Sequence, residues 1–84
     1  MTYRIEILRS AQRQIAKIDR QDQSRIVMAI RDLASSPRPA GCKKLSSRPA
    51  WRIRVGDYRV IYEIHDDQLL ILVVTIGHRR DIYR

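Results

Sequence analysis

The sequence predicts an α+β domain in which an N-terminal strand and an antiparallel helical hairpin precede a mainly antiparallel sheet. Two observations carry this prediction: apolar residues recur at helical spacing between Ala11 and Ala34, and they alternate with polar residues after residue 50. At 84 residues the chain has room for one core, because a typical domain holds about 100–150 residues. We therefore expect a single domain over residues 1–84.

The first half of the chain predicts one strand and two helices. Residues 3–7 alternate apolar with charged side chains, as a half-buried strand does. A helix capped by Ser10 should follow, and then a second helix, capped by Asp22, whose apolar residues run from Ile26 to Ala34. The second helix should end before Pro37. The short polar turn between the helices predicts an antiparallel hairpin.

The second half predicts three strands and a short edge strand. Trp51–Val55 and Tyr58–Ile64 alternate between apolar and polar residues, whereas Leu69–Ile76 is apolar on both faces and should lie centrally. Cys42–Leu45 gives a weak signal for a further edge strand. The sheet should therefore hold three or four strands after the hairpin.

Gly56 and Asp57 separate two of these strands, and a two-residue loop of this composition predicts a β-hairpin with a fixed register. In that register Arg54 stands opposite Arg59, and Arg52 lies on the same face. The other face gathers the apolar and aromatic residues Trp51, Ile53, Val55, Tyr58, Val60 and Tyr62. We expect the helices to cover the apolar face and to leave the arginines open.

These three arginines form a candidate anion site. Like charges directly opposite each other in an antiparallel pair destabilise the sheet by a few tenths to about 1 kcal/mol. Only Glu63 brings the opposite charge to this face, and it lies far from Arg54. Because the cluster destabilises the sheet locally, we interpret it as a functional site. It would bind phosphate and stabilise negative charge in a transition state. A solvated basic face without a function is the alternative.

The charge balance points to a polyanionic partner. Seventeen Lys and Arg against nine Asp and Glu give a net charge of +8 and a pI near 10.6, which favours nucleic acid or an acidic protein segment. The longest apolar run, within residues 69–76, is far shorter than the roughly 20 residues that span a bilayer. Nothing at the amino end resembles a signal peptide. We therefore expect a cytoplasmic protein without membrane contact.

The carboxyl end of the chain contains further candidate site residues. His78, Arg79 and Tyr83 come to one edge of the sheet, and a tyrosine so near the end favours stacking on a base or general-base catalysis over core packing. Cys42 and the two histidines lack metal-ligand spacing, so we expect no metal and no cofactor. No Gly-rich phosphate loop, serine triad or carboxylate pair occurs. RNA cleavage fits a site made of Arg, Tyr and His without a metal, because the 2′-hydroxyl of the RNA supplies the nucleophile.

Two strings in the sequence resemble a known family. Trp51–Tyr62 (WRIRVGDYRVIY) and Gly77–Tyr83 (GHRRDIY) resemble the RelE branch of the RelE/ParE toxin superfamily, and the order of elements agrees along essentially the whole chain. The resemblance implies the toxin of a type II toxin–antitoxin pair, a metal-free endoribonuclease that enters the ribosomal A site and cuts mRNA. Its partners would be a RelB-like antitoxin, the ribosome and mRNA, with operator DNA reached only through the antitoxin.

The resemblance also implies roles by position. Arg52 and Arg54 match the two basic residues of the family's active strand, and Arg59 matches an arginine suited to the scissile phosphate. Arg79 matches an arginine that stabilises the transition state or the leaving group, and Tyr83 matches a tyrosine that stacks on or orients the substrate base. The family's best-known members carry lysines in place of the first two, and an arginine effectively cannot lose its proton.

Three questions stay open at this point. The general base is Tyr83, His78 or no residue at all. A ParE-like inhibitor of DNA gyrase would use the same scaffold to bind without nuclease activity; the missing lysines favour it, and Arg79 and Tyr83 oppose it. A non-toxic nucleic-acid-binding module would cause no growth arrest on expression.

Overall fold

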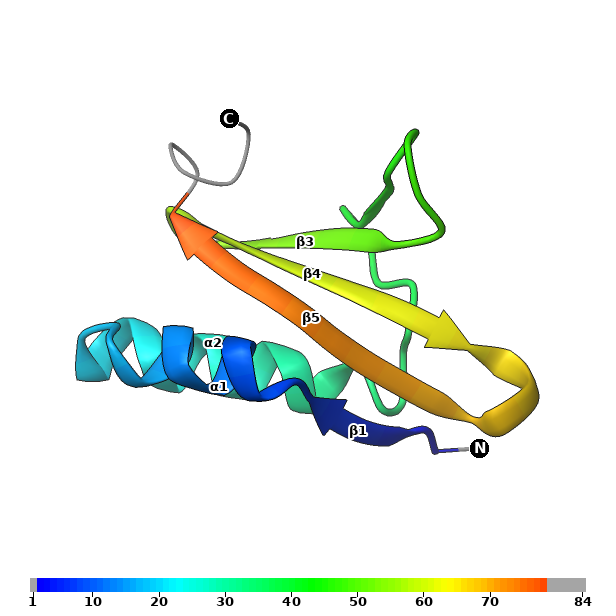
Figure 1. Ribbon diagram of the computed structural model, residues 1–84, viewed down its shortest axis with the longest axis horizontal. Coiled ribbons are helices and arrows are strands. Elements are labelled where there is room, and N and C mark those ends of the chain that lie inside the picture. The colour runs from blue at the N-terminus through cyan, green and yellow to red at the C-terminus, as the bar shows by residue number, and fades with distance from the viewer. Residues whose placement is uncertain (1, 79–84) are drawn as a thin grey trace.

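The chain forms one strand, then two helices, then the rest of the sheet (Figure 1). A computed structural model describes residues 2–78. In chain order the elements are β1 (Arg4–Ile7), α1 (Arg9–Ala16), α2 (Arg20–Asp32), β2 (Lys43–Lys44), β3 (Trp51–Val55), β4 (Tyr58–His65), the 3₁₀ turn η1 (Asp66–Gln68) and β5 (Leu70–His78). The strands form one sheet in the order β1-β5-β4-β3-β2, with β1 parallel to β5 and the other neighbours antiparallel. This confirms the α+β prediction, with the short edge strand present and β1 in the same sheet.

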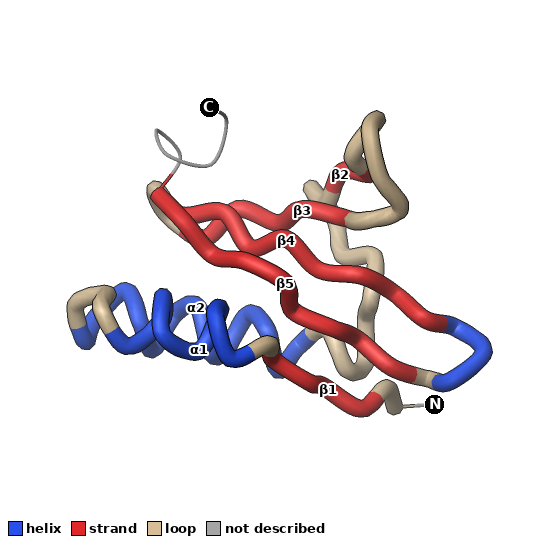
Figure 2. The backbone as a smooth tube through the Cα atoms, in the orientation of Figure 1, coloured by secondary structure: helices blue, strands red, loops and turns tan. Residues whose placement is uncertain are grey.

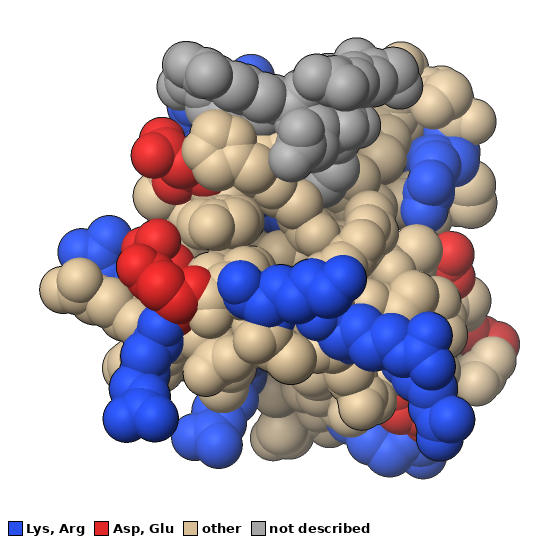
Figure 3. Space-filling model, turned by 60° about the vertical axis from the view of Figure 1, so that its left-hand side comes forward, with Lys and Arg blue, Asp and Glu red and all other residues tan. Residues whose placement is uncertain are grey.

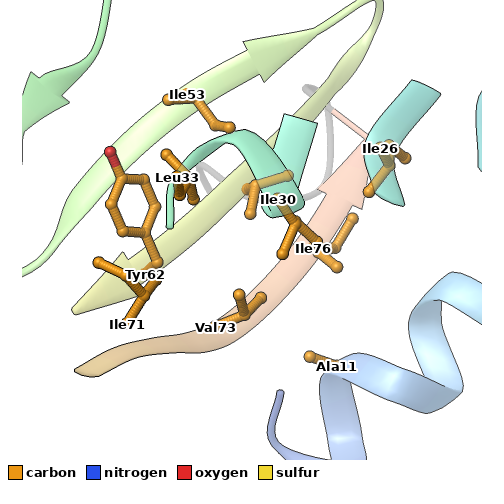
Figure 4. Close-up of a cluster of buried hydrophobic side chains, with 10 residues drawn as sticks. Ala11, Ile26, Ile30, Leu33, Ile53, Tyr62, Ile71, Val73 and Ile76 are labelled. Atoms are coloured by element: carbon orange, nitrogen blue, oxygen red, sulfur yellow. The ribbon is translucent and has the colours of Figure 1, made fainter. Parts of the chain in front are cut away.

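Both helices lie side by side on one face of the sheet (Figures 1 and 2). The core between the two layers consists of Ala11, Ile26, Ile30, Leu33, Ile53, Val60, Tyr62, Ile71, Val73 and Ile76 (Figure 4). Burying each of the large apolar side chains contributes about 1.5–3 kcal/mol. Across the described residues, no helix is long and apolar enough to cross a bilayer.

The β3–β4 hairpin has the predicted register. Val55 pairs with Tyr58, and every following pair agrees as far as Trp51 with Tyr62. Gly56 has a φ of +60°, which suits the glycine that a tight hairpin turn requires at its first central position. β5 lies in the interior of the sheet, between β1 and β4, as its apolar faces predicted.

Both predicted helix caps were wrong. Leu8, not Ser10, precedes α1, and it provides no side-chain cap. The reason is that the chain passes from β1 straight into the helix: the Leu8 amide donates to the Val73 carbonyl (3.0 Å), so the first turn begins before Ser10. In α2 the cap is Asp19, whose carboxylate accepts from the backbone amide of Asp22 (2.9 Å).

Helix α1 protects the edge of β5 beyond the end of β1. The Gln14 side-chain oxygen accepts from the Ile76 backbone amide (2.7 Å) and from the Thr75 hydroxyl (3.2 Å). An exposed sheet edge presents unpaired amides that invite wrong strand pairing. Gln14 satisfies one of them and fixes α1 against the sheet.

A polar cluster holds the segment between α2 and β2. Asp66 accepts from the Tyr3 hydroxyl (2.5 Å) and pairs with Arg38 (3.0 Å); the Tyr3 hydrogen bond and the Arg38 guanidinium lower the pKa of Asp66. Arg38 also lies over the Trp51 ring, 5.2 Å from its centroid.

A second contact to this segment comes from Tyr62. The buried Tyr62 hydroxyl donates to the Pro37 carbonyl (2.7 Å), and burial raises the pKa of Tyr62. These contacts fix the path of the chain into β2.

Candidate functional site

The β3–β4 hairpin places the three predicted arginines on one face of the sheet, opposite the helices. Arg54 stands directly opposite Arg59, and Arg52 pairs with Ile61 one step further along the same face. The positions follow from the strand register alone, which the sequence predicted. Because strands are rigid elements, the site needs no ordering of a loop to bring these charges together.

A fourth cation joins them from β2. Lys43 pairs with Arg52, so its side chain emerges on the same face as the arginines. We call Lys43, Arg52, Arg54 and Arg59 the basic cluster. The sequence predicted the edge strand but not the place of Lys43, because the long connection from α2 leaves the register of β2 undefined until the Arg38 and Tyr62 contacts fix the path of the chain. The available signal was the pair of adjacent lysines in the expected edge strand, because one of two neighbouring strand residues must lie on each face.

The basic cluster is less open than predicted. Arg54 and Lys43 are exposed, but Arg52 and Arg59 are partly buried. Ile61, on the same face, is only 7% exposed. Part of each guanidinium is itself withdrawn from water, because Arg52 Nε and Arg59 Nη1 are buried. The helices leave this face uncovered as expected, but the expectation of open side chains was wrong for Arg52 and Arg59.

The rest of this face is electrically balanced. Glu63 lies there as predicted, but it contacts His65 (Oε1 to Nε2, 2.9 Å). On β1, Arg4 pairs with Glu6 (2.9 Å), and Glu6 shares the face through its pairing with Leu72. Positive charge is thus concentrated around the β3–β4 hairpin, as an anion site requires.

The carboxyl end of β5 borders the basic cluster. Gly77 pairs with Arg59, so the residue of β5 directly opposite Arg59 contributes no side chain. Arg79 and Tyr83, the two other predicted site residues, lie outside the described residues. Their assignment remains an expectation from the sequence.

His78 was a candidate general base, and its position contradicts that role. It pairs with Tyr58, which lies on the face that the helices cover. The two rings meet edge to face, with centroids 5.6 Å apart. Because neighbouring residues of a strand point to opposite faces, the His78 side chain points away from the basic cluster.

The basic cluster can bind a phosphodiester and stabilise negative charge on it. Guanidinium groups hold phosphate oxygens through paired, planar hydrogen bonds, and such groups stabilise the extra charge of a pentavalent transition state. Three of the four cations cannot release a proton, since a guanidinium stays protonated. Lys43 is the member of the cluster that can.

The chain is similar to toxins of known families. The family model described as the ParE toxin of type II toxin–antitoxin systems, parDE, matches residues 5–83. Toxin RelG of Mycobacterium tuberculosis is 31% identical over the whole of this chain and 99% of its own length. The chain belongs to the RelE/ParE toxin superfamily.

Further relatives place this toxin in the RelE branch. An Escherichia coli protein named as a putative RelE-like toxin is 25% identical over 99% of the chain and 92% of its own length. In the crystal structure of the archaeal RelE–RelB complex from Pyrococcus horikoshii, the similar chain has a TM-score of 0.85 and 25% identity, with 96% of this chain and 99% of that one covered. The predicted family is confirmed: the chain is a RelE-like toxin of a type II toxin–antitoxin system.

Proposed function

We propose that this toxin is a ribosome-dependent endoribonuclease that cuts mRNA in the ribosomal A site and thereby inhibits translation in the cytoplasm. The observation that carries the proposal is the basic cluster, in which Lys43, Arg52, Arg54 and Arg59 share one sheet face. Membership of the RelE branch supports the choice of RNA over other phosphodiesters.

The proposed reaction uses the substrate's own nucleophile. The ribose 2′-oxygen attacks the neighbouring phosphorus, the bond from phosphorus to the 5′-oxygen breaks, and a 2′,3′-cyclic phosphate and a 5′-hydroxyl result. Arg59 binds the scissile phosphate, while Arg52 and Arg54 hold the strand and offset its charge. Arg79 stabilises the transition state or the leaving oxygen, and Tyr83 stacks on or orients the substrate base.

Proton transfer needs a group that can change its protonation state. One proton leaves the 2′-hydroxyl and one reaches the 5′-oxygen. Tyr83 is one candidate. Lys43 is the other, because it stands opposite Arg52 on the reacting face and an amine, unlike a guanidinium, can exchange a proton.

Substitution of Lys43 distinguishes charge from proton transfer. If Lys43 moves a proton, Lys43→Arg keeps the positive charge but slows cleavage by about 10²–10⁴-fold and flattens the pH–rate profile. The neighbouring Lys44→Arg, whose side chain lies on the other face of β2, is the matched control and should leave the rate unchanged. Full activity of Lys43→Arg in single-turnover cleavage would restrict Lys43 to a charge role and leave Tyr83 as the candidate base.

The proposed partner is a RelB-like antitoxin. The Pyrococcus horikoshii relative was crystallised as a RelE–RelB complex. An extended or helical antitoxin segment with carboxylates opposite the basic cluster would neutralise the toxin by charge complementarity. Contact with operator DNA would then come only through the antitoxin.

Primer extension on a defined mRNA, incubated with the purified toxin with and without ribosomes, tests the proposed function. We expect cuts at the A-site codon only when ribosomes are present. Cuts without ribosomes would contradict ribosome dependence. Growth arrest without any cuts would favour inhibition of DNA gyrase, which the match to the ParE family model makes the second candidate. Inhibition of gyrase supercoiling by the same preparation would establish it.

A further inference from the structure

Helix α1 carries a second set of cations on its outer surface. Arg9 and Arg13 lie in α1 and Lys17 is its C-cap; the three recur at intervals of four residues and are all exposed. Each interval rises about 6 Å along the helix axis and turns about 40° around it, so the three positions form a row about 12 Å long that winds slowly around the helix. We call these three residues the α1 stripe. No Asp or Glu occurs from residue 7 to residue 18, and within residues 2–78 no carboxylate forms an ion pair with the stripe.

The stripe opposes the stability of its own helix. Like charges four residues apart destabilise a helix by about 0.2–0.5 kcal/mol per pair, and the stripe contains two such pairs. Arg9 also occupies the first turn, where the helix dipole disfavours a cation and where no acidic residue or side-chain cap compensates. Arg13 in the last turn and Lys17 at the C-cap lie where the dipole favours a cation, so the unfavourable terms are the position of Arg9 and the repulsion between neighbouring charges. These terms favour a role for the charge itself.

The stripe and the basic cluster face opposite directions. On α1, Ala11, Ile15 and Ile18 pack toward the core, so the stripe points away from the sheet. The basic cluster lies on the sheet face that the helices leave uncovered. Figure 3 shows Lys and Arg side chains spread over the lower, helical part of the molecule. A strand of RNA bound in the basic cluster therefore does not contact the stripe.

We propose that the α1 stripe is a second RNA-binding surface, which holds the phosphate backbone of a double-helical RNA segment distinct from the strand in the basic cluster. Phosphates supply regularly spaced negative charge, and contacts to them require only positioned cations. The outer residues beside the stripe are Ser10, Gln12 and Ala16. They offer no aromatic ring for the unstacked bases of a single strand. They also lack the apolar centre on which a protein interface depends.

Salt-dependent binding to a nuclease-resistant RNA hairpin tests this surface. The probe is a fluorescein-labelled hairpin in which every ribose carries a 2′-O-methyl group, and fluorescence anisotropy gives its affinity over a series of salt concentrations. Neutralising the stripe with Arg9→Gln, Arg13→Gln and Lys17→Gln together should lower the slope of log affinity against log salt by about 2–3, close to one per lost phosphate contact. Glutamine is a good helix former, so α1 should persist.

The matched control removes the same charge elsewhere. Arg31→Gln, Lys44→Gln and Arg48→Gln together alter exposed residues of α2, β2 and the loop before β3, and the slope should change by less than about 1. Equal slopes for the two triple variants would overturn the proposal. So would a stripe variant that keeps its RNA affinity but loses binding to a poly-glutamate peptide, since that result assigns the stripe to an acidic protein segment. The 2′-oxygens are blocked and no ribosome is present, so this test stands whether or not the toxin cleaves mRNA.

Discussion

Replacing Arg59 with glutamine is expected to slow cleavage of ribosome-bound mRNA by about 10²–10³-fold, the loss that follows removal of one group aimed at developing transition-state charge. Arg59 lies on β4 directly opposite Arg54, within the basic cluster. Glutamine keeps hydrogen-bonding capacity but carries no charge. The rate is measured by primer extension under single-turnover conditions, and growth arrest on expression should weaken in parallel.

The control for this change is Arg48→Gln. It removes the same charge from an exposed position in the loop before β3, so it reports any general effect of net charge on ribosome binding. We expect near-normal activity from Arg48→Gln. Equal cleavage by the two variants would mean that Arg59 is not part of the site. Both proteins should melt like the unaltered toxin, because neither side chain belongs to the core.

Replacing Ile26 with alanine is expected to destabilise the fold by about 2–5 kcal/mol, because the substitution leaves a cavity between α2 and the sheet. Ile26 has no solvent exposure. Domains of this kind have a total stability of about 5–15 kcal/mol, so the loss is a large fraction. The melting temperature should fall by at least about 8 °C, measured by circular dichroism.

Met28→Ala tests whether that loss comes from burial. Met28 lies two residues away on the same helix but is 64% exposed, so its truncation should change stability by no more than about 0.5 kcal/mol. Alanine is favourable in a helix at either position, which removes helix propensity as an explanation. A similar loss at both positions would contradict the packing of α2 on the sheet.

Local sequence was enough to predict the β3–β4 hairpin and, with it, three members of the basic cluster. The loop Gly56–Asp57 fixes which residues stand opposite each other, and alternation along a strand then fixes their face. The order of strand, helical hairpin and sheet followed from the spacing of apolar residues in the same way. These features depend on residues close together in the sequence, so their patterns carry the information.

The helix caps show where local patterns mislead. Ser10 and Asp22 have the right chemistry, but α1 begins at the end of β1, where the Leu8 amide pairs with β5. α2 begins at Asp19 instead. The first residue of each helix depends on where the preceding segment packs in the folded protein. Boundaries of this kind are decided by tertiary contacts rather than by the residue at the cap.

The sequence by itself determined the charge of the toxin, its order of elements and the row of arginines on the hairpin. Only the tertiary structure placed Lys43 opposite Arg52 and brought the Glu63 carboxylate into contact with the His65 ring. It also placed the His78 side chain on the face away from the basic cluster. The reason is that strand register within a two-residue hairpin is set by the turn, whereas pairing across longer connections is set by packing and by distant contacts such as Arg38 with Asp66.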